Sequence, residues 1–470
     1  MPQRNLLAIA AVGLASIACW QTSRGDSKDS KDELMELYGV FIDAVEQVES
    51  NYVREVSRRE LLESALQGML QDLDPHSTYY SESEWKTFQR TFEGSFSGIG
   101  IQVEVDAKSK RLKVLAPLIG TPAYQAGILA GDLILEVDGE STEGITQDKA
   151  VEMLQGRPGT SVTLTVLHPG SEKSETLDVT REVIASESVL GVDRRADDTW
   201  EYFLDPEAKI GYIRVSSFYQ TTAADIRRAM EQLQGEGMRG LILDLRTNPG
   251  GLLSAAVEVS DLFVDGGVIV STKGRNTRER RFMANGSGTY GEFPMVILVN
   301  SHSASAAEIV SACLQDAGRA KVAGERSFGK GSVQNIIPLE GGASFLKLTV
   351  ESYFRPSGGN IHKFPDMTDE DEWGVSPDEG LEIELSPEEY VRWELARRRK
   401  DVTSRIARRV VEEDQADGEV PPDRQLDKAL EFLRGELDGE DAASDAGESE
   451  PSGESEDAAP ESDTTETPSL

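Results

Sequence analysis

The stretch Leu241-Ile242-Leu243-Asp244-Leu245-Arg246-Thr247-Asn248-Pro249-Gly250-Gly251 decides the fold of the largest part of this chain. A strand-like apolar run ends at a carboxylate, a glycine-containing turn follows, and residues 252–263 carry an apolar helical pattern. The same order recurs where Val296-Ile297-Leu298-Val299 precedes an apolar helical stretch over 306–317. Strands that alternate with helices predict an α/β domain, which we place at 183–386. The loops between strand and helix fall at the strand carboxyl ends, where sites on such sheets gather.

Residues 96–182 carry a different pattern, in which short β-like runs are separated by Gly, Pro and Asp. These runs are 100–105, 111–115, 133–137 and 162–167, and they predict a small β-rich module. Gly98-Ile99-Gly100-Ile101, together with the glycine-containing stretch over 120–139, resembles a PDZ domain. Backbone N–H groups of such a loop can point together at a carboxylate, and the adjacent sheet edge can accept a peptide as a strand. We therefore expect Gly98, Ile99, Gly100 and Ile101 to bind a peptide carboxyl terminus.

Helical patterns flank these two domains. Residues 33–92 predict a helical N-terminal domain, in which Ser57 and Glu60 form a capping box ahead of an apolar run. Such a short helical pair must pack on another domain or on a second copy of itself. Residues 387–436 form a charged helical region, whose run over 390–413 can pack on the N-terminal helices or a second subunit. Simple solvent exposure is the default for this run, and a weak membrane-surface contact through its basic face stays open.

The N-terminus has the features of an export signal. Arg4 precedes an apolar stretch over 6–18, which is long enough for a signal sequence and too short to span a bilayer comfortably. Residues 1–19 are therefore predicted to be a signal peptide or lipoprotein signal, and 20–32 a linker. Cleavage, lipid attachment at Cys19 and an uncleaved anchor all remain open. We expect export to a bacterial periplasm or cell envelope, with attachment to the membrane through the N-terminus as an alternative.

Composition argues against nucleic-acid and metal-ion partners and also characterises the acidic C-terminus and Cys313. The formal charge of −36 argues against nucleic acid, because binding a polyanion needs clustered Lys and Arg. Residues 437–470 are rich in Asp, Glu, Ser, Pro and Gly, and we read them as a disordered acidic tail. The 4 histidines are scattered without paired ligand spacing, so neither a metal nor another cofactor is expected. Cys313 lies in an apolar helical pattern and is interpreted as a small buried hydrophobe.

Three segments carry candidate chemistry, and each has a simpler reading when it is taken alone. The glycines after Pro249 are typical of a turn, Ser-Ala-Ser before a helix is typical of an N-cap, and Lys330 between glycines is typical of a solvated loop. Together they supply the parts of acyl transfer: a hydroxyl nucleophile, an amine that takes its proton, and backbone donors for the oxyanion. The amide of Ala306 is a natural donor at a helix start, and the flexible Gly250 and Gly251 can offer a second.

An amine at its reference pKa of about 10.4 is almost fully protonated at neutral pH and cannot act as a base. Lys330 must therefore be desolvated in order to work, and Phe328, Gly329 and Val333 supply apolar company for it.

The segments Asn300-Ser301-His302-Ser303-Ala304-Ser305-Ala306-Ala307-Glu308 and Ser327-Phe328-Gly329-Lys330-Gly331 resemble those of the S41 peptidases, the carboxyl-terminal processing proteases. The resemblance runs from about Leu34 to Leu385. It implies a ClpP/crotonase-like protease core, on which the N-terminal segment packs. It further implies that Ser305 is the nucleophile, Lys330 the general base and Gln334 a supporting residue. Ala307 departs from a frequent serine, and the acidic insertion over 366–372 leaves the shape of that segment open.

The resemblance implies an endopeptidase that captures exposed apolar carboxyl termini of proteins on its PDZ domain and cleaves through an acyl-enzyme. His302, three residues before Ser305, is the rival base, but a residue on the strand-to-helix loop need not face the hydroxyl. A homodimer through the N- and C-terminal helices is a further expectation. The alternative function is a catalytically inactive scaffold on the same fold, although a scaffold has no need to keep hydroxyl, amine and glycine pair together.

Overall fold

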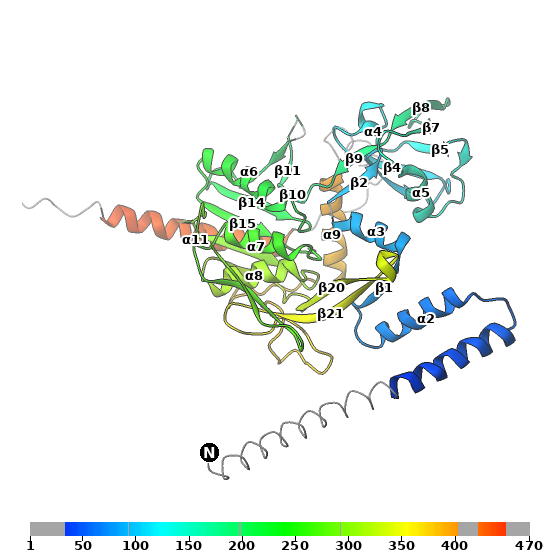
Figure 1. Ribbon diagram of the computed structural model, residues 1–470. Coiled ribbons are helices and arrows are strands. Elements are labelled where there is room, and N and C mark those ends of the chain that lie inside the picture. Colours follow the sequence, from blue (N-terminus) through cyan, green and yellow to red (C-terminus); the bar gives the residue numbers. More distant parts are fainter. Residues whose placement is uncertain are drawn as a thin grey trace, which may run out of the picture. The chain divides into compact units, whose positions relative to one another are not determined.

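The structure is a computed structural model that describes residues 33–92, 94–195, 197, 199–291, 293–402 and 422–447 (Figure 1). The chain divides into two compact units, one of Met1–Trp85 with Gln334–Thr349 and one of Lys86–Val333 with Val350–Leu470. The predicted signal, the linker and residues 448–470 of the predicted tail lie outside the described residues. Within the described ranges, no helix is long and apolar enough to cross a membrane.

The first unit contains the predicted helical pair, which consists of a helix over 33–51 and α2 (Arg58–Gln71). The predicted capping box is confirmed: the Ser57 hydroxyl accepts the N–H of Glu60 at 3.1 Å, and the Glu60 carboxylate accepts the N–H of Ser57 at 3.0 Å. A small antiparallel pairing completes the unit, since β1 lies against the first residues of β21. The further elements are β1 (Thr78–Ser81), α3 (Glu82–Phe92), which runs into the second unit, β20 (Ser332–Leu339), the 3-10 turn Glu340–Gly342 and β21 (Ser344–Phe354).

The predicted β-rich module is a sheet of order β3-β4-β5-β7-β8 over one apolar core. Its strands start and end close to the predicted runs because their buried residues alternate with half-buried ones, as in β4 and β7. The elements are β2 (Ser95–Gly98), β3 (Ile101–Val105), β4 (Leu112–Pro117), α4 (Pro122–Gln125), β5 (Leu133–Val137), β6 (Glu140–Ser141), α5 (Gln147–Leu154), β7 (Ser161–Leu167), β8 (Glu175–Thr180) and β9 (Glu182–Ala185). Because β2 pairs with β9, the two ends of the module meet.

The predicted α/β domain is confirmed by a parallel sheet in which β14, β15, β18 and β19 lie side by side. β10 and β13 add antiparallel edges to β14. The elements are β10 (Val189–Leu190), β11 (Asp193–Arg194), β12 (Trp200–Glu201), β13 (Phe203–Asp205), β14 (Ile210–Val215), α6 (Thr222–Gly235), β15 (Gly240–Asp244), α7 (Leu253–Asp261), β18 (Met295–Val299), α8 (Ala306–Asp316) and β19 (Lys321–Gly324).

Both faces of this sheet are covered, which explains why its strands read as continuous apolar runs. Leu241 and Leu243 of β15 join a core with α6, α7 and α8, whereas Ile242 between them joins a second core with α11. Figure 1 shows α7 and α8 over the sheet. A second, antiparallel sheet contains β16 (Val268–Lys273) and β17 (Arg280–Met283), and it also pairs β16 with the last residues of β21.

Two C-terminal helices, α9 (Pro387–Val402) and α11 (Arg424–Gly447), complete the description. The predicted tail is wrong for residues 437–447, because they continue α11. Ala429, Leu433 and Leu437 lie buried at four-residue spacing in the second core, so the buried stripe of the helix reaches the first residue of the predicted tail. In α9, Trp393 and Glu394 are buried, so the default of simple solvent exposure is also wrong for this helix.

Candidate active site

Three loops meet at the carboxyl ends of the adjacent parallel strands β15, β18 and β19. The loops are bonded directly to one another. The N–H of Ala304 donates to the carbonyl oxygen of Asn248 at 2.9 Å, and the N–H of Phe328 donates to that of Ser303 at 2.9 Å. The structure thus brings together the three segments on which the candidate chemistry depends.

Ser305 connects the loop after β18 to helix α8, with φ 56° and ψ −112°. A positive φ is strained for a residue with a side chain, by about 1–3 kcal/mol, and must be held by its surroundings. The N–H of Ser305 donates to Oε2 of Glu308 at 2.8 Å, and the Tyr353 hydroxyl lies near the Ser305 side chain. Ser305 is only 8% exposed, so its hydroxyl lies in a largely desolvated turn that the Glu308 carboxylate holds.

Glu308 is fully buried and joins the nucleophile turn to the lysine loop. Its Oε2 accepts the N–H groups of Ser305 and Lys330, both at 2.8 Å, and its Oε1 accepts the Ser327 hydroxyl and the Gly329 N–H, both at 2.6 Å. Burial raises the pKa of Glu308 to about 7, although these four hydrogen bonds favour the charged form. One carboxylate therefore holds the backbone of both predicted reacting residues.

Lys330 lies in this loop and is partly buried. Burial lowers the pKa of its amine, and the negative charge of Glu308 opposes the shift. The direction is the one that a general base requires. The apolar residues expected around Lys330 differ in their burial: Val333 is only 8% exposed, but the Phe328 side chain is 52% exposed and lies largely in solvent.

Gly250 lies against the nucleophile turn. A Cβ placed on it would come within 2.7 Å of the Ser305 Cβ and 3.1 Å of the Ala306 nitrogen. Its own N–H is occupied, since it donates to Oδ1 of Asn248 at 2.8 Å. The hydrogen bonds found within the described part of the chain engage neither the N–H of Gly251 nor that of Ala306. The N–H groups of Gly251 and Ala306 are therefore not used by these hydrogen bonds, whereas that of Gly250 is, and the oxyanion role of all three residues stays a prediction.

Two other predicted residues have different surroundings. Gln334 belongs to the first unit, where its side chain donates to the Thr349 hydroxyl at 3.2 Å, and its supporting role stays a prediction. His302 stacks its ring on Tyr390 of α9, with centroids 4.7 Å apart and planes inclined by 4°. Among the described residues, no hydrogen bond joins either the His302 ring or the Lys330 amine to Ser305, so the stacking of His302 on Tyr390 is the feature that distinguishes the two.

The predicted carboxylate loop of the β-rich module leads into an edge strand. Gly98 ends β2, Ile99 is buried in the core, and Gly100 has φ 78° before Ile101 begins β3. The carbonyl oxygens of Ile99 and Gly100 are fixed by the N–H groups of Ala123 and Leu118, at 2.9 and 2.8 Å. Because β3 stands at the end of the strand order, a peptide can extend the sheet there.

Two further features bear on cofactors and thiol chemistry. Within the described ranges, no group of three or more His, Cys, Asp or Glu side chains is arranged to hold a metal ion. Cys313 is a buried free cysteine of α8, and burial raises the pKa of its thiol to about 12. This confirms its interpretation as a small buried hydrophobe.

The sequence reasoning missed the roles of three residues around the site. Glu308 stands three positions after Ser305, and this Ser-x-x-Glu spacing is a capping-box signal that could have revealed it. Asn248 orders the glycine loop through Gly250, and Tyr353 approaches Ser305 from β21. We find no local sequence signal for Tyr353, because its contact joins residues far apart in the chain.

Comparisons with protein families cover most of this architecture. Residues 209–380 match the peptidase family S41, residues 113–167 match a PDZ domain, and residues 15–84 match the N-terminal domain of the activating protease CtpB. The family match spans the loops that carry Ser305 and Lys330.

Individual relatives agree with these matches. A carboxy-terminal-processing protease of Bartonella bacilliformis is 38% identical over 84% of this chain and 88% of its own length. A carboxyl-terminal-processing protease of Synechocystis is 36% identical over 71% and 74%, and carboxy-terminal processing protease CtpA of Bacillus subtilis is 35% identical over 73% and 68%. With this identity over most of both chains, the protein belongs to peptidase family S41, among the carboxy-terminal-processing proteases.

Proposed function

We propose that the chain is a serine endopeptidase in which Ser305 is the nucleophile and Lys330 the general base. The observation that carries this proposal is the partly buried Lys330 amine, whose pKa is lowered, in a loop that shares the buried carboxylate of Glu308 with the turn of Ser305. An amine with a lowered pKa has a larger unprotonated fraction at neutral pH, and only that form accepts the hydroxyl proton.

The acylation step follows from these roles. The Ser305 Oγ attacks the peptide carbonyl carbon, its proton passes to the Lys330 Nζ, and the carbonyl electron pair moves onto oxygen. The N–H groups of Gly251 and Ala306 then donate to the oxyanion. Collapse breaks the C–N bond, and the Lys330 ammonium returns the proton to the leaving amine.

Deacylation repeats this chemistry with water. Lys330 accepts a proton from the water that attacks the Ser305 ester, the C–O bond to Ser305 breaks, and the serine recovers its proton as the peptide acid leaves. We expect Gln334 to support Lys330. We also assign the ClpP/crotonase-like fold to the protease core, as the family resemblance implies.

The experiment compares the wild type with three variants in their cleavage of an unfolded polypeptide that has a free, apolar carboxyl terminus. Ser305→Ala and Lys330→Ala should each abolish cleavage without loss of folding, whereas His302→Ala should retain it. A Lys330→Ala protein with wild-type turnover would end the dyad assignment. A fluorophosphonate probe that labels the wild type and Ser305→Ala equally would favour the inactive scaffold instead.

Substrate capture is assigned to the PDZ domain, through the loop of Gly98, Ile99, Gly100 and Ile101 and the edge strand β3. The support is the edge position of β3 and the backbone geometry of the loop. A peptide with a free carboxylate should bind more tightly than the same peptide with a terminal amide. Equal affinity for the two peptides would remove the assignment.

We also assign the mature protein to the periplasm or cell envelope and expect it to form a homodimer. The support for self-association is a set of large apolar side chains on the helix over 33–51 that are between 39% and 69% exposed, among them Tyr38, Val40, Phe41 and Val48. Replacing Tyr38 and Phe41 by Ser should convert a dimer in light scattering to a monomer. Localisation is tested by fractionation of cells that express the full chain.

A further inference from the structure

Helix α9 reaches the loop after β15 through one side chain. Nη1 of Arg397 donates to the carbonyl oxygen of Arg246 and to the Thr247 hydroxyl, both at 3.2 Å. Arg246 and Thr247 precede Arg397 by 151 and 150 positions in the sequence. The charged helix thus has a specific contact with the loop that leads to Gly250 and Gly251.

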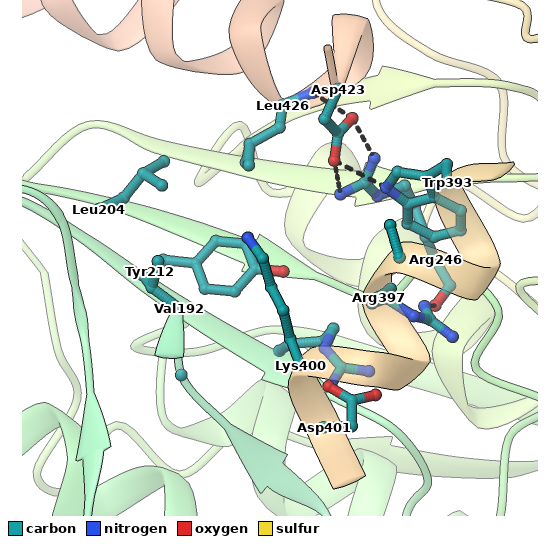
Figure 2. A pocket seen from close by; sticks show the side chains of 13 residues that line it. Val192, Leu204, Tyr212, Arg246, Trp393, Arg397, Lys400, Asp401, Asp423 and Leu426 are labelled. Atoms are coloured by element: carbon teal, nitrogen blue, oxygen red, sulfur yellow. Dashed lines mark hydrogen bonds and ion pairs between the residues drawn. The ribbon is translucent and has the colours of Figure 1, made fainter. Parts of the chain in front are cut away.

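A stack of aromatic and cationic groups fixes Arg397 in place (Figure 2). The guanidinium carbons of Arg397 and Arg246 lie 4.7 and 4.5 Å from the ring centroid of Trp393, within the range of cation–π attraction. Nε1 of Trp393 donates to Asp423 at 2.8 Å, and Asp423 also pairs with Arg246 at 2.7 Å. Arg397 also forms an ion pair with Glu394 at 2.8 Å, which orients its guanidinium group toward the loop.

The turn that Arg397 contacts is strained and leads directly to the nucleophile. Thr247 has φ 59°, and its N–H is held by the Asn300 side chain at 2.9 Å. The next residue, Asn248, accepts the N–H of Gly250 on its side chain and that of Ala304 on its carbonyl. Ala304 precedes Ser305. A shift at Thr247 therefore reaches both the glycine loop and the nucleophile turn through one residue.

We propose that Arg397 is a positioning residue for the peptidase reaction: it braces the positive-φ turn at Thr247 so that the Gly250-Gly251 segment stays against Ser305. The inference rests on the proposed role of Ser305. Arg397 does not touch the reacting atoms, so its removal should lower kcat and leave KM little changed. A displacement of about 1 Å at the reacting groups costs about a hundredfold in rate, and we expect a loss of about tenfold to a hundredfold.

The test separates positioning from folding by its choice of background. Removing Arg397 leaves the carboxylate of Glu394 buried without this partner, so Arg397→Ala is made in a Glu394→Gln protein and compared with Glu394→Gln alone. Arg397→Lys keeps the charge and one donor and should recover part of the loss. Arg392→Ala removes an exposed arginine from the same helix and is the matched control.

Chemical rescue provides a readout that a structural role would not give. A cavity of about 210 Å³ borders the Arg397 side chain, and Figure 2 shows Trp393 and Tyr212 in its walls. Arg214 also lines it. A guanidinium ion can enter a space of this size once the Arg397 side chain is gone. Millimolar guanidinium chloride should restore fluorophosphonate labelling of the Arg397→Ala protein, and sodium chloride at equal ionic strength should not.

The outcomes decide the proposal. The proposal is supported if Arg397→Ala in the Glu394→Gln protein slows labelling and lowers kcat at an unchanged melting temperature, and if Arg397→Lys or guanidinium recovers both rates. Wild-type labelling by the Arg397→Ala protein overturns it, as does a loss that neither recovers and that follows the melting temperature. If Ser305→Ala is labelled like the wild type, the proposed function fails instead, and this outcome is independent of every Arg397 variant.

Discussion

Replacing Gly250 by Ala places a methyl group against the nucleophile. The new Cβ would lie 2.7 Å from the Ser305 Cβ and 2.9 Å from the Ala304 carbonyl oxygen. Non-bonded carbon atoms pack at about 3.5–4.0 Å, so the two must separate by about 1 Å. Gly250 also has φ 103°, which disfavours alanine by about 1–2 kcal/mol.

We expect kcat/KM for an unfolded peptide substrate to fall about a hundredfold, because a misplacement of about 1 Å is enough for that loss. Fluorophosphonate labelling of Ser305 should slow in parallel, and the melting temperature should fall by only a few degrees. Gly267→Ala is the matched control: it has φ 92° and no atom within 4 Å of the added Cβ, so it adds backbone strain without the contact. Wild-type turnover by Gly250→Ala, or an equal loss in Gly267→Ala, would refute the reasoning.

Three further predictions concern protonation and peptide capture. The kcat/KM of the wild type should fall as pH is lowered through the pKa of Lys330, since only the free amine accepts the proton, and the midpoint should lie below 10.5; a midpoint at or above that value would contradict desolvation. Burial raises the Glu308 pKa from 4.5 to about 7, so the unfolded state ionises first and the free energy of unfolding should decrease as pH rises through this window. Relative to Glu308→Gln, the decrease should approach about 3 kcal/mol in urea titrations, and a pH-independent difference would exclude it. Gly100→Ala puts a Cβ 2.4 Å from the Cβ of Thr121 and should weaken the binding of a peptide with a free carboxylate. In fluorescence anisotropy, the affinity for the same peptide with a terminal amide should stay unchanged.

Strands and helices of the protease core were predictable because their signals are local. β15 and β18 begin within one residue of the predicted apolar runs, and α7 and α8 end within two residues of the predicted helical stretches. A strand that is covered on both faces needs an almost unbroken apolar run, and this requirement is visible in the sequence. Once these strands are parallel neighbours, their carboxyl ends bring Ser305, Lys330 and the glycine loop to one edge.

Prediction failed where a long-range contact overrides composition. The acidic composition over 437–470 suggested a tail, but its first residue, Leu437, is buried in the second core and α11 continues to Gly447. The charged run of α9 suggested exposure, yet Trp393 is buried between partners from other parts of the chain. Neither partner set can be read from the segment itself.

The sequence by itself determined the layout of the chain, the family resemblance and the residues that can perform acyl transfer. Only the tertiary structure decided how these residues are held: Glu308 links the turns of Ser305 and Lys330, the N–H of Gly250 is occupied, and α9 contacts the loop at Thr247. The physical reason is that burial and hydrogen-bond partners depend on groups from distant segments. A lowered lysine pKa and a raised carboxyl pKa arise only when folding removes water from both.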